Sequence, residues 1–592
     1  MWDYLIVGIY VIAIFGVGFY FSREKKNAET YLLGGRSMPA WAVGIASMMT
    51  LFSSISIVQT PGEIFNHGMT LNLMGSYIGP FLSIPCYMLF ARFYFRLQSF
   101  TPFEYLEYRY DKSVRGIVAF SSFYIRVVYI GMVLYTSSKI FSGAFGWPTI
   151  FSILLVAFVG VSLCFIGGSK AIIWTDVFQA IIVFGGLFGV VIMLCCKIQG
   201  GAWEAVATAW ADGHGLPEFS EAEFYTISPY VRLLFWLLLW NMIAGVLLDA
   251  CSNQVAVQLY LNCKNWKEGL KSQLYSIFSG LATTILLTFI GLALYTYYKQ
   301  NPCEELMGPI RQGDKALFIF IKNFIPTPLL GLLMAAMLSA IMSTVSGVTN
   351  SMSGLWVREF HRKFINKNMS SEQEYHVLRK TTVVLGIVAT LFAIGLDISG
   401  KWLQQSVSEV ATLFYFLSAA ILPAYLYAVL SKRANAPLIW AVTIFATGET
   451  IAWNVWYALS RSSLQAWQVD PSVGFGWAGK LPGIYVWPWF VCGAILLLPL
   501  LKKALRKKIW VTVVAAIGIG AIGVGCGMAI WYGFSHLLIN EVPRARSFAF
   551  TLPIPLFLGF IILRFCPIQP REKWQGLVVG SLHDEILVQK KD

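Results

Sequence analysis

The sequence has few charged residues for its length. Asp, Glu, Lys and Arg make up only 12% of its 592 residues, whereas soluble domains contain about a quarter. Its ten cysteines form no CxxC pair, and it has neither a GxxxxGK[ST] nor an HExxH motif. We therefore expect no ordinary cytosolic protein, no disulfide framework, no zinc site, no ATP hydrolysis and no metalloprotease.

Long apolar runs make up most of the chain. Hydrophobic residues reach 57% and the mean hydropathy is +0.65. A membrane-spanning helix needs roughly 17–25 residues, and lipid offers no partner for open backbone groups, so each run should be helical. The pattern predicts one all-α polytopic domain in a lipid bilayer. Its fifteen candidate spans are 2–21, 40–65, 71–97, 115–142, 148–167, 170–197, 229–260, 271–297, 327–354, 378–398, 405–431, 437–458, 485–501, 509–535 and 549–565.

The basic residues indicate an orientation and not a nucleic-acid partner. The net charge is +14, but most Lys and Arg lie in short loops between the spans. If the N-terminus is outside, these loops alternate as the positive-inside rule requires. The loop 198–228, expected outside, has five acidic residues and no Lys or Arg. We expect a protein of the cell (inner or plasma) membrane with its C-terminus in the cytoplasm. The first span has no cleavage site and is read as an anchor.

The second span has an unusual run of polar residues. Thr50, Ser53, Ser56 and Gln59 lie near its middle, and Pro61-Gly62 follow. A Pro-Gly pair is a poor continuation of a helix, so we expect an interruption here. Carbonyl groups freed at this depth are tolerated where they line a cavity or bind something. The alternative interpretation is a Ser-rich helix-packing face.

The ninth span, 327–354, is rich in small and hydroxyl residues. Ser343 and Thr344 are neighbours, so their hydroxyls cannot face the same groove. A hard monovalent cation such as sodium prefers oxygen ligands, and unwound carbonyls on one helix with hydroxyls on another would supply them. Taken alone, the span is equally typical of a small-residue packing helix. Together, the second and ninth spans favour an ion site.

Asp176 and Arg126 are two of the charged residues that lie within spans. Asp176 follows a Gly-Gly pair in the sixth span, where a carboxylate is expensive and suggests function by default. A structural salt bridge and wetting from the cytoplasm are the alternatives. Arg126 needs a carboxylate partner, which could belong to the protein or to a substrate.

Six stretches resemble the sodium:solute symporters, the family of the sodium–glucose, iodide, monocarboxylate, multivitamin, proline and sialic acid transporters. In order they are YLLGGRSMPAW (31–41), PGEIFNHG (61–68), GGSKAIIWTDVFQ (167–179), NQVAVQLYL (253–261), the hydroxyl-rich helix (331–354) and SKRANA (431–436). The resemblance implies a LeuT-like core of two inverted five-helix repeats whose first and sixth helices are broken. The implied parts are an N-terminal helix and loop (1–39), the first repeat (40–197), an outer loop (198–228), the second repeat (229–436), peripheral helices (437–566) and a cytoplasmic tail (567–592).

The resemblance also implies binding residues. Sodium would be bound by the carbonyls of Met49, Phe52 and Ala340 and the hydroxyls of Ser343 and Thr344. Asp176 and Ser346 would bind a second sodium or act in gating. Gly347 occupies the position at which the second sodium site would have a further hydroxyl. The candidate solute-binding residues are Ser53, Ser56, Gln59, Tyr77, Arg126, Trp240, Asn241 and Tyr415.

The expected function is sodium-coupled import of a small polar solute by alternating access. The solute would be a sugar, a sugar acid or a monocarboxylate, and the missing hydroxyl at Gly347 favours a neutral one. A membrane sensor with the same fold, which reports a solute without moving it, is the alternative. We expect no enzyme activity, no organic cofactor, sodium as the only metal ion, and a functional monomer.

Overall fold

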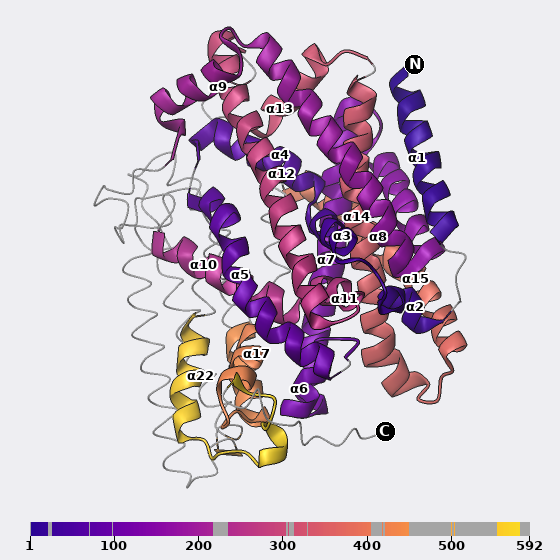
Figure 1. Ribbon diagram of the computed structural model, residues 1–592, viewed down its shortest axis with the longest axis vertical. Coiled ribbons are helices and arrows are strands. Elements are labelled where there is room, and N and C mark those ends of the chain that lie inside the picture. Colours follow the sequence, from indigo (N-terminus) through magenta and orange to yellow (C-terminus); the bar gives the residue numbers. More distant parts are fainter. Residues whose placement is uncertain are drawn as a thin grey trace. The chain divides into compact units, whose positions relative to one another are not determined.

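The structure is a computed structural model, and its described residues form helices and no strands (Figure 1). It describes residues 2–21, 27–69, 71–97, 99–216, 235–303, 306, 313–327, 329–403, 417, 421–448, 451, 499, 502–503 and 553–579. The main helices are α1 (Trp2–Phe21), α2 (Ala28–Leu33), α3 (Ala40–Leu51), α4 (Ser54–His67), α5 (Leu71–Arg96), α6 (Glu104–Arg109), α7 (Lys112–Phe145), α8 (Thr149–Lys197), α9 (Gly201–Ala209), α10 (Phe235–Ser252), α11 (Gln254–Leu261), α12 (Trp266–Gln300), α13 (Gly313–Phe324), α14 (Leu329–Trp356), α15 (Ser371–Leu403), α17 (Ile421–Leu430) and α22 (Pro553–Phe565). A further apolar helix covers Ala436–Gly448.

The apolar helices are long enough to cross a membrane. Seven in the described residues qualify by length and composition, or nine if each of two bent pairs counts as one span. Two of the fifteen expected spans, 485–501 and 509–535, fall almost wholly outside the described residues. The all-helical, multi-span architecture agrees with the sequence.

The helices group into two compact units. The first contains Met1–Phe95, Arg126–Phe219 and Asn253–Val407, and the second contains Arg96–Ile125, Ser220–Ser252 and Ser408–Asp592. Within the first unit, α14 packs against α8, α1, α3 and α15 (Figure 1). Its small residues let these neighbours approach closely, as is usual between helices in lipid. The most apolar window of α14 is 83% buried, against 17% for that of α1.

The helix interruption expected in the second span is present, but not at Pro61-Gly62. Helix α3 ends at Leu51, and α4 begins at Ser54, at 66° to it. Phe52 and Ser53 between them have extended backbones. Helix α4 runs on through Pro61, so the expectation that this pair would break the helix was wrong. A proline removes one backbone donor, a loss that the rest of α4 tolerates.

Two of the motif stretches meet at a buried asparagine, Asn262, that directly follows a third stretch. The backbone oxygen of Asn262 accepts a hydrogen bond from Met38 N at 3.1 Å, and its Oδ1 accepts one from the Ser169 hydroxyl at 3.0 Å. Gly34 has a positive φ of 54°, and a Cβ there would lie 2.8 Å from Asn262 Oδ1. The glycine is therefore required both by its backbone and by this contact.

The second unit is tied together by one buried arginine. Arg109 of α6 donates from Nε to the carbonyl of Ala428 at 2.8 Å and from Nη2 to the carbonyl of Ser431. Tyr110 donates its hydroxyl proton to the carbonyl of Ala424 at 3.0 Å. The two Arg109 bonds reach carbonyls at the C-terminal end of α17, where helix carbonyls have no intrahelical donor, and the Tyr110 bond reaches a carbonyl in its first turn.

Candidate cation and solute site

The interruption between α3 and α4 lies against the hydroxyl-rich helix α14. The hydroxyl oxygen of Thr344 is 3.1 Å from the carbonyl oxygen of Phe52 and 3.0 Å from that of Ala340. Because α3 ends at Leu51, its last carbonyls, including that of Met49, lie at a helix end that lacks further N–H donors. Met49, Ala340 and Thr344 are fully buried. The structure thus brings a helix end and a hydroxyl together in a buried cluster of neutral oxygens.

A carboxylate lies beside the neighbouring hydroxyl on α14. Asp176 of α8 is completely buried, and the Thr50 hydroxyl donates to its Oδ2 at 3.3 Å. The Ser343 hydroxyl is close to the same carboxyl. Asp176 Oδ1 and Ser343 Oγ have no hydrogen-bond partner of good geometry in the described part of the chain. A buried carboxyl with only hydroxyl neighbours has unused capacity for a proton or a cation.

Gly347 and Thr50 form a matched pair. A Cβ at Gly347 would lie 2.4 Å from Thr50 Cγ2 and 2.8 Å from its Oγ1. The space that a side chain at 347 would need is therefore filled by Thr50, which presents a hydroxyl to Asp176 from α3. Ser346 instead donates to the carbonyl of Ser343 at 3.2 Å, within its own helix.

Tyr10 of α1 extends the polar cluster on α14. Its hydroxyl accepts a hydrogen bond from Ser339 Oγ at 2.8 Å. Ser339 is one turn before Ser343 on the same helix. We did not identify Tyr10 from the sequence, because a single tyrosine in an apolar span is also typical of interfacial packing.

The candidate solute residues are distributed over several elements. Ser53 is buried at the interruption, Ser56 is half-buried, and Gln59 on α4 is exposed. The Tyr77 hydroxyl forms a hydrogen bond with that of Thr288 at 2.6 Å. Arg126 is half-buried on α7, and its guanidinium lies 5.9 Å from the centre of the Tyr129 ring.

Two further candidates lie in the second unit, and one lies outside the described residues. Trp240 and Asn241 lie on α10 of the second unit. Tyr415 lies outside the described residues.

Comparison with known proteins decides the family. A model of the sodium:solute symporter family matches residues 31–440, which is more than half of the chain. The chain belongs to the sodium:solute symporter family. It is an integral membrane protein that couples the transport of a small solute to sodium, and the sequence-based prediction of family and coupling is confirmed.

Several relatives are bacterial or mammalian transporters. This symporter is 26% identical over 434 residues to a sodium/sialic acid symporter of Proteus mirabilis, covering 73% of this chain and 86% of the relative. It is 26% identical over 423 residues to the human sodium-coupled monocarboxylate transporter 1, covering 69% of this chain and 66% of the relative. A solved sodium-coupled sialic acid symporter in a substrate-bound outward-open state has a TM-score of 0.69 at 24% identity, covering 76% of this chain and 91% of that one. That likeness indicates that this chain has the fold of the LeuT-like transporters.

Proposed function

We propose that this symporter imports a small organic anion of the sugar-acid or monocarboxylate type together with sodium, by alternating access. The observation that carries the sodium part is the Thr344 hydroxyl, which lies within 3.1 Å of carbonyl oxygens on both sides of it. The anionic solute is suggested by relatives named as sialic acid and monocarboxylate transporters.

The proposed sodium ligands are the carbonyls of Met49, Phe52 and Ala340 and the hydroxyls of Ser343 and Thr344. Thr344 has a single hydroxyl proton, which cannot satisfy two carbonyls fully at the same time. A cation among these oxygens would interact with all of them and would hold the helix end of α3 against α14. Sodium would thereby preorganise the adjacent solute site, so that each ligand tightens the binding of the other.

We propose a second cation at Asp176, ligated with Ser343 and Thr50 and with Ser346 close by. The missing hydroxyl at Gly347 favoured one sodium and a neutral solute. Thr50 supplies a hydroxyl to Asp176 from another helix, and this contact supports a second cation despite the glycine. Two sodium ions and a monovalent anion carry one net charge. A tenfold sodium gradient and 100 mV would then supply about 5 kcal/mol, or a several-thousand-fold accumulation.

The remaining assignments complete the proposal. The solute would contact Ser53, Ser56, Gln59 and Tyr77, and Arg126 would meet its carboxylate. Trp240, Asn241 and Tyr415 stay candidate solute contacts on the strength of the family resemblance. The proposed topology has about fifteen spans, an outer N-terminus, a cytoplasmic C-terminus and a functional monomer. The proposed domain boundaries remain those given from the sequence.

Uptake into proteoliposomes tests the proposal. Purified protein is assayed with labelled sialic acid, lactate, glucose and proline under inward gradients of sodium or potassium. We expect saturable, sodium-dependent uptake of an acid, and the apparent affinity for it should fall when Arg126 becomes Gln but less when it becomes Lys. Sodium-dependent uptake of glucose or proline alone would refute the anionic solute.

A further inference from the structure

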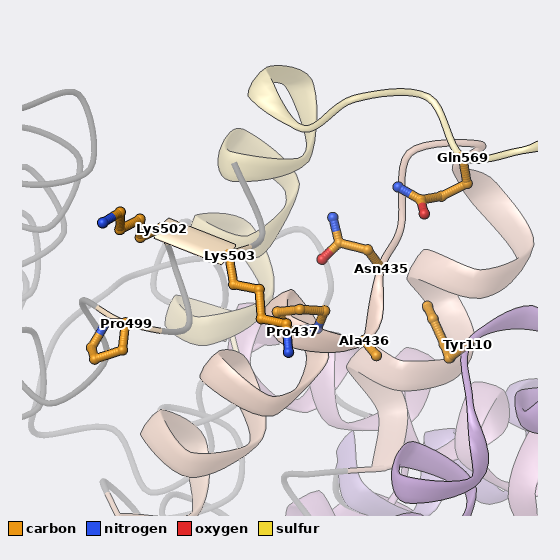
Figure 2. Close-up of a pocket in the computed structure, with 8 residues that line it drawn as sticks. All are labelled: Tyr110, Asn435, Ala436, Pro437, Pro499, Lys502, Lys503 and Gln569. Atoms are coloured by element: carbon orange, nitrogen blue, oxygen red, sulfur yellow. The ribbon is translucent and has the colours of Figure 1, made fainter. Parts of the chain in front are cut away.

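The second unit contains a cavity that is separate from the cation and solute site. Its volume is about 630 Å³, and its described lining residues are Tyr110, Asn435, Ala436, Pro437, Pro499, Lys502, Lys503 and Gln569. Figure 2 shows Lys503 extending toward Pro437, with Asn435 and Gln569 nearby and Lys502 pointing the other way at the rim. The volume is in the range of pockets that hold small organic groups.

The cavity lies where apolar helices end. Helix α17 ends at Leu430, the next apolar helix begins at Ala436, and α22 ends at Phe565. Leu430 and Phe565 are exposed on the second unit. Helices of this hydropathy end near the boundary between hydrocarbon and headgroups. A ligand in the cavity would therefore be at headgroup depth, with apolar surface beside it.

The two lysines differ from the other basic groups around the cavity. Arg433 donates to the carbonyls of Arg564 and Cys566, and Lys573 donates to the carbonyl of Tyr110 at 2.6 Å. These cations serve to hold backbone segments together. Lys502 and Lys503 are exposed and form no ion pair with the described residues. No described residue of the lining is acidic. The described lining therefore carries positive charge and no acidic group that would neutralise it.

We propose that this cavity binds a phosphate group, held chiefly by Lys503 with Lys502 at the rim. Phosphate attracts ammonium groups strongly, and basic pockets between helix ends bind anionic lipid headgroups. The same chemistry would be offered by the headgroup of an anionic phospholipid or by a soluble phosphate. The exposed apolar surface beside the cavity favours the lipid, whose acyl chains would cover it.

The test uses the full-length protein in detergent. The Tm is followed while phosphatidylglycerol, phosphatidylcholine or inorganic phosphate is added at constant ionic strength. The variant is K502Q/K503Q. The matched control is K367Q/K380Q, which removes the same charge from two exposed lysines of the first unit. Each lysine near a headgroup contributes a factor of about five in affinity, so the pair should contribute about 25-fold.

We expect phosphatidylglycerol to raise the Tm of the wild type and of the control, and to require about 25-fold more lipid in K502Q/K503Q. A similar rise with inorganic phosphate, lost in the same variant, would support the site and identify a soluble ligand. The proposal would be overturned if neither phosphatidylglycerol nor inorganic phosphate raised the Tm, or if they stabilised K502Q/K503Q as much as the wild type. The two substitutions are also made singly. A larger effect of K502Q than of K503Q would place the anion outside this cavity and would also overturn the proposal.

Discussion

Ser343 and Thr344 are adjacent on α14, yet they face different chemistry. Thr344 faces two carbonyl oxygens, at 3.0 and 3.1 Å. Ser343 is close to the carboxyl of Asp176, which the Thr50 hydroxyl also contacts. One side of α14 therefore faces neutral carbonyl oxygens, and the adjacent side faces the ionisable carboxyl of Asp176.

The difference matters when no ion is bound. A hydroxyl beside carbonyls can donate its own proton to one of them, so the empty cluster remains partly satisfied. A buried carboxylate without a basic partner has no proton of its own to donate, so it must bind a proton or a cation. We therefore expect the Thr344 cluster to release its ion easily and the Asp176 cluster to be coupled to protons or to a second ion.

The largest expected effect is at the neutral cluster. Replacing Thr344 by Ala removes a proposed sodium ligand, and a hydrogen-bond-type contact to a charged group contributes about 1.5–3 kcal/mol. The sodium concentration for half-maximal uptake should therefore rise about 10- to 100-fold. Thr344→Ser keeps the oxygen and should stay within a few-fold of wild type. Uptake measured against sodium concentration checks this, and an unchanged sodium dependence in T344A would remove Thr344 from the site.

The next effect is at the carboxylate. Asp176→Asn removes a charge that is costly to keep inside a membrane protein unless it has a function, so it should slow uptake about tenfold. It should also lower the sodium Hill coefficient from about two to about one. The matched control is Asp397→Asn. Asp397 is an equally buried carboxyl, but it has a basic partner, because Lys139 lies 2.8 Å away. Wild-type rates and cooperativity in D176N would leave Asp176 structural.

Steric fit between Gly347 and Thr50 gives a smaller effect. Gly347→Ala should destabilise the protein by about 1–3 kcal/mol, because the new Cβ overlaps Thr50 Cγ2. Adding Thr50→Ser removes that methyl group and keeps the hydroxyl on Asp176, so it should restore part of the Tm. Thr50→Val should not, since it keeps the bulk and loses the hydroxyl. A G347A protein as stable as wild type would contradict this packing.

The smallest effect is at Tyr10. Tyr10→Phe removes the acceptor for Ser339, but Ser339 Oγ still lies 2.8 Å from the carbonyl of Ala335. We expect a loss of about 0.5–1.5 kcal/mol in stability and little change in sodium affinity. Thermal unfolding and sodium titration of uptake measure the two separately. A strong loss of sodium affinity would show that Tyr10 acts on the ion cluster itself.

The sequence predicted the kind of fold and the pairing of two spans, but not how they meet. Hydropathy and hydroxyl content are local properties, so the interrupted span and the α14 helix could be recognised. The interruption itself lies at Phe52 and Ser53, where the carbonyl of Phe52 meets Thr344 of α14. The family resemblance implied that these two groups share a sodium ion, but no local signal in the sequence marks a contact 292 residues away. The Pro61-Gly62 pair was a stronger local signal for a helix interruption, but α4 continues through it.

The contact of Thr50 with Asp176 was missed for a similar reason. Each residue was notable on its own, but their contact depends on Thr50 filling the space that a side chain at position 347 would need. A glycine in a helix was interpretable from the sequence only as a missing hydroxyl. The buried amide of Asn262 likewise joins segments whose proximity only the fold decides.

Helix α1 has one narrow buried stripe, formed by Asp3, Tyr10, Ile14 and Gly18, and its other residues are half-buried or exposed. Its hydropathy suits contact with acyl chains on that exposed side. The same helix holds the backbone N–H of Gly331 through Asp3 at 2.8 Å and the Ser339 hydroxyl through Tyr10. A change in lipid thickness that tilts α1 would therefore pull on α14 at two points, so that the bilayer is mechanically coupled to the helix that carries the proposed sodium ligands.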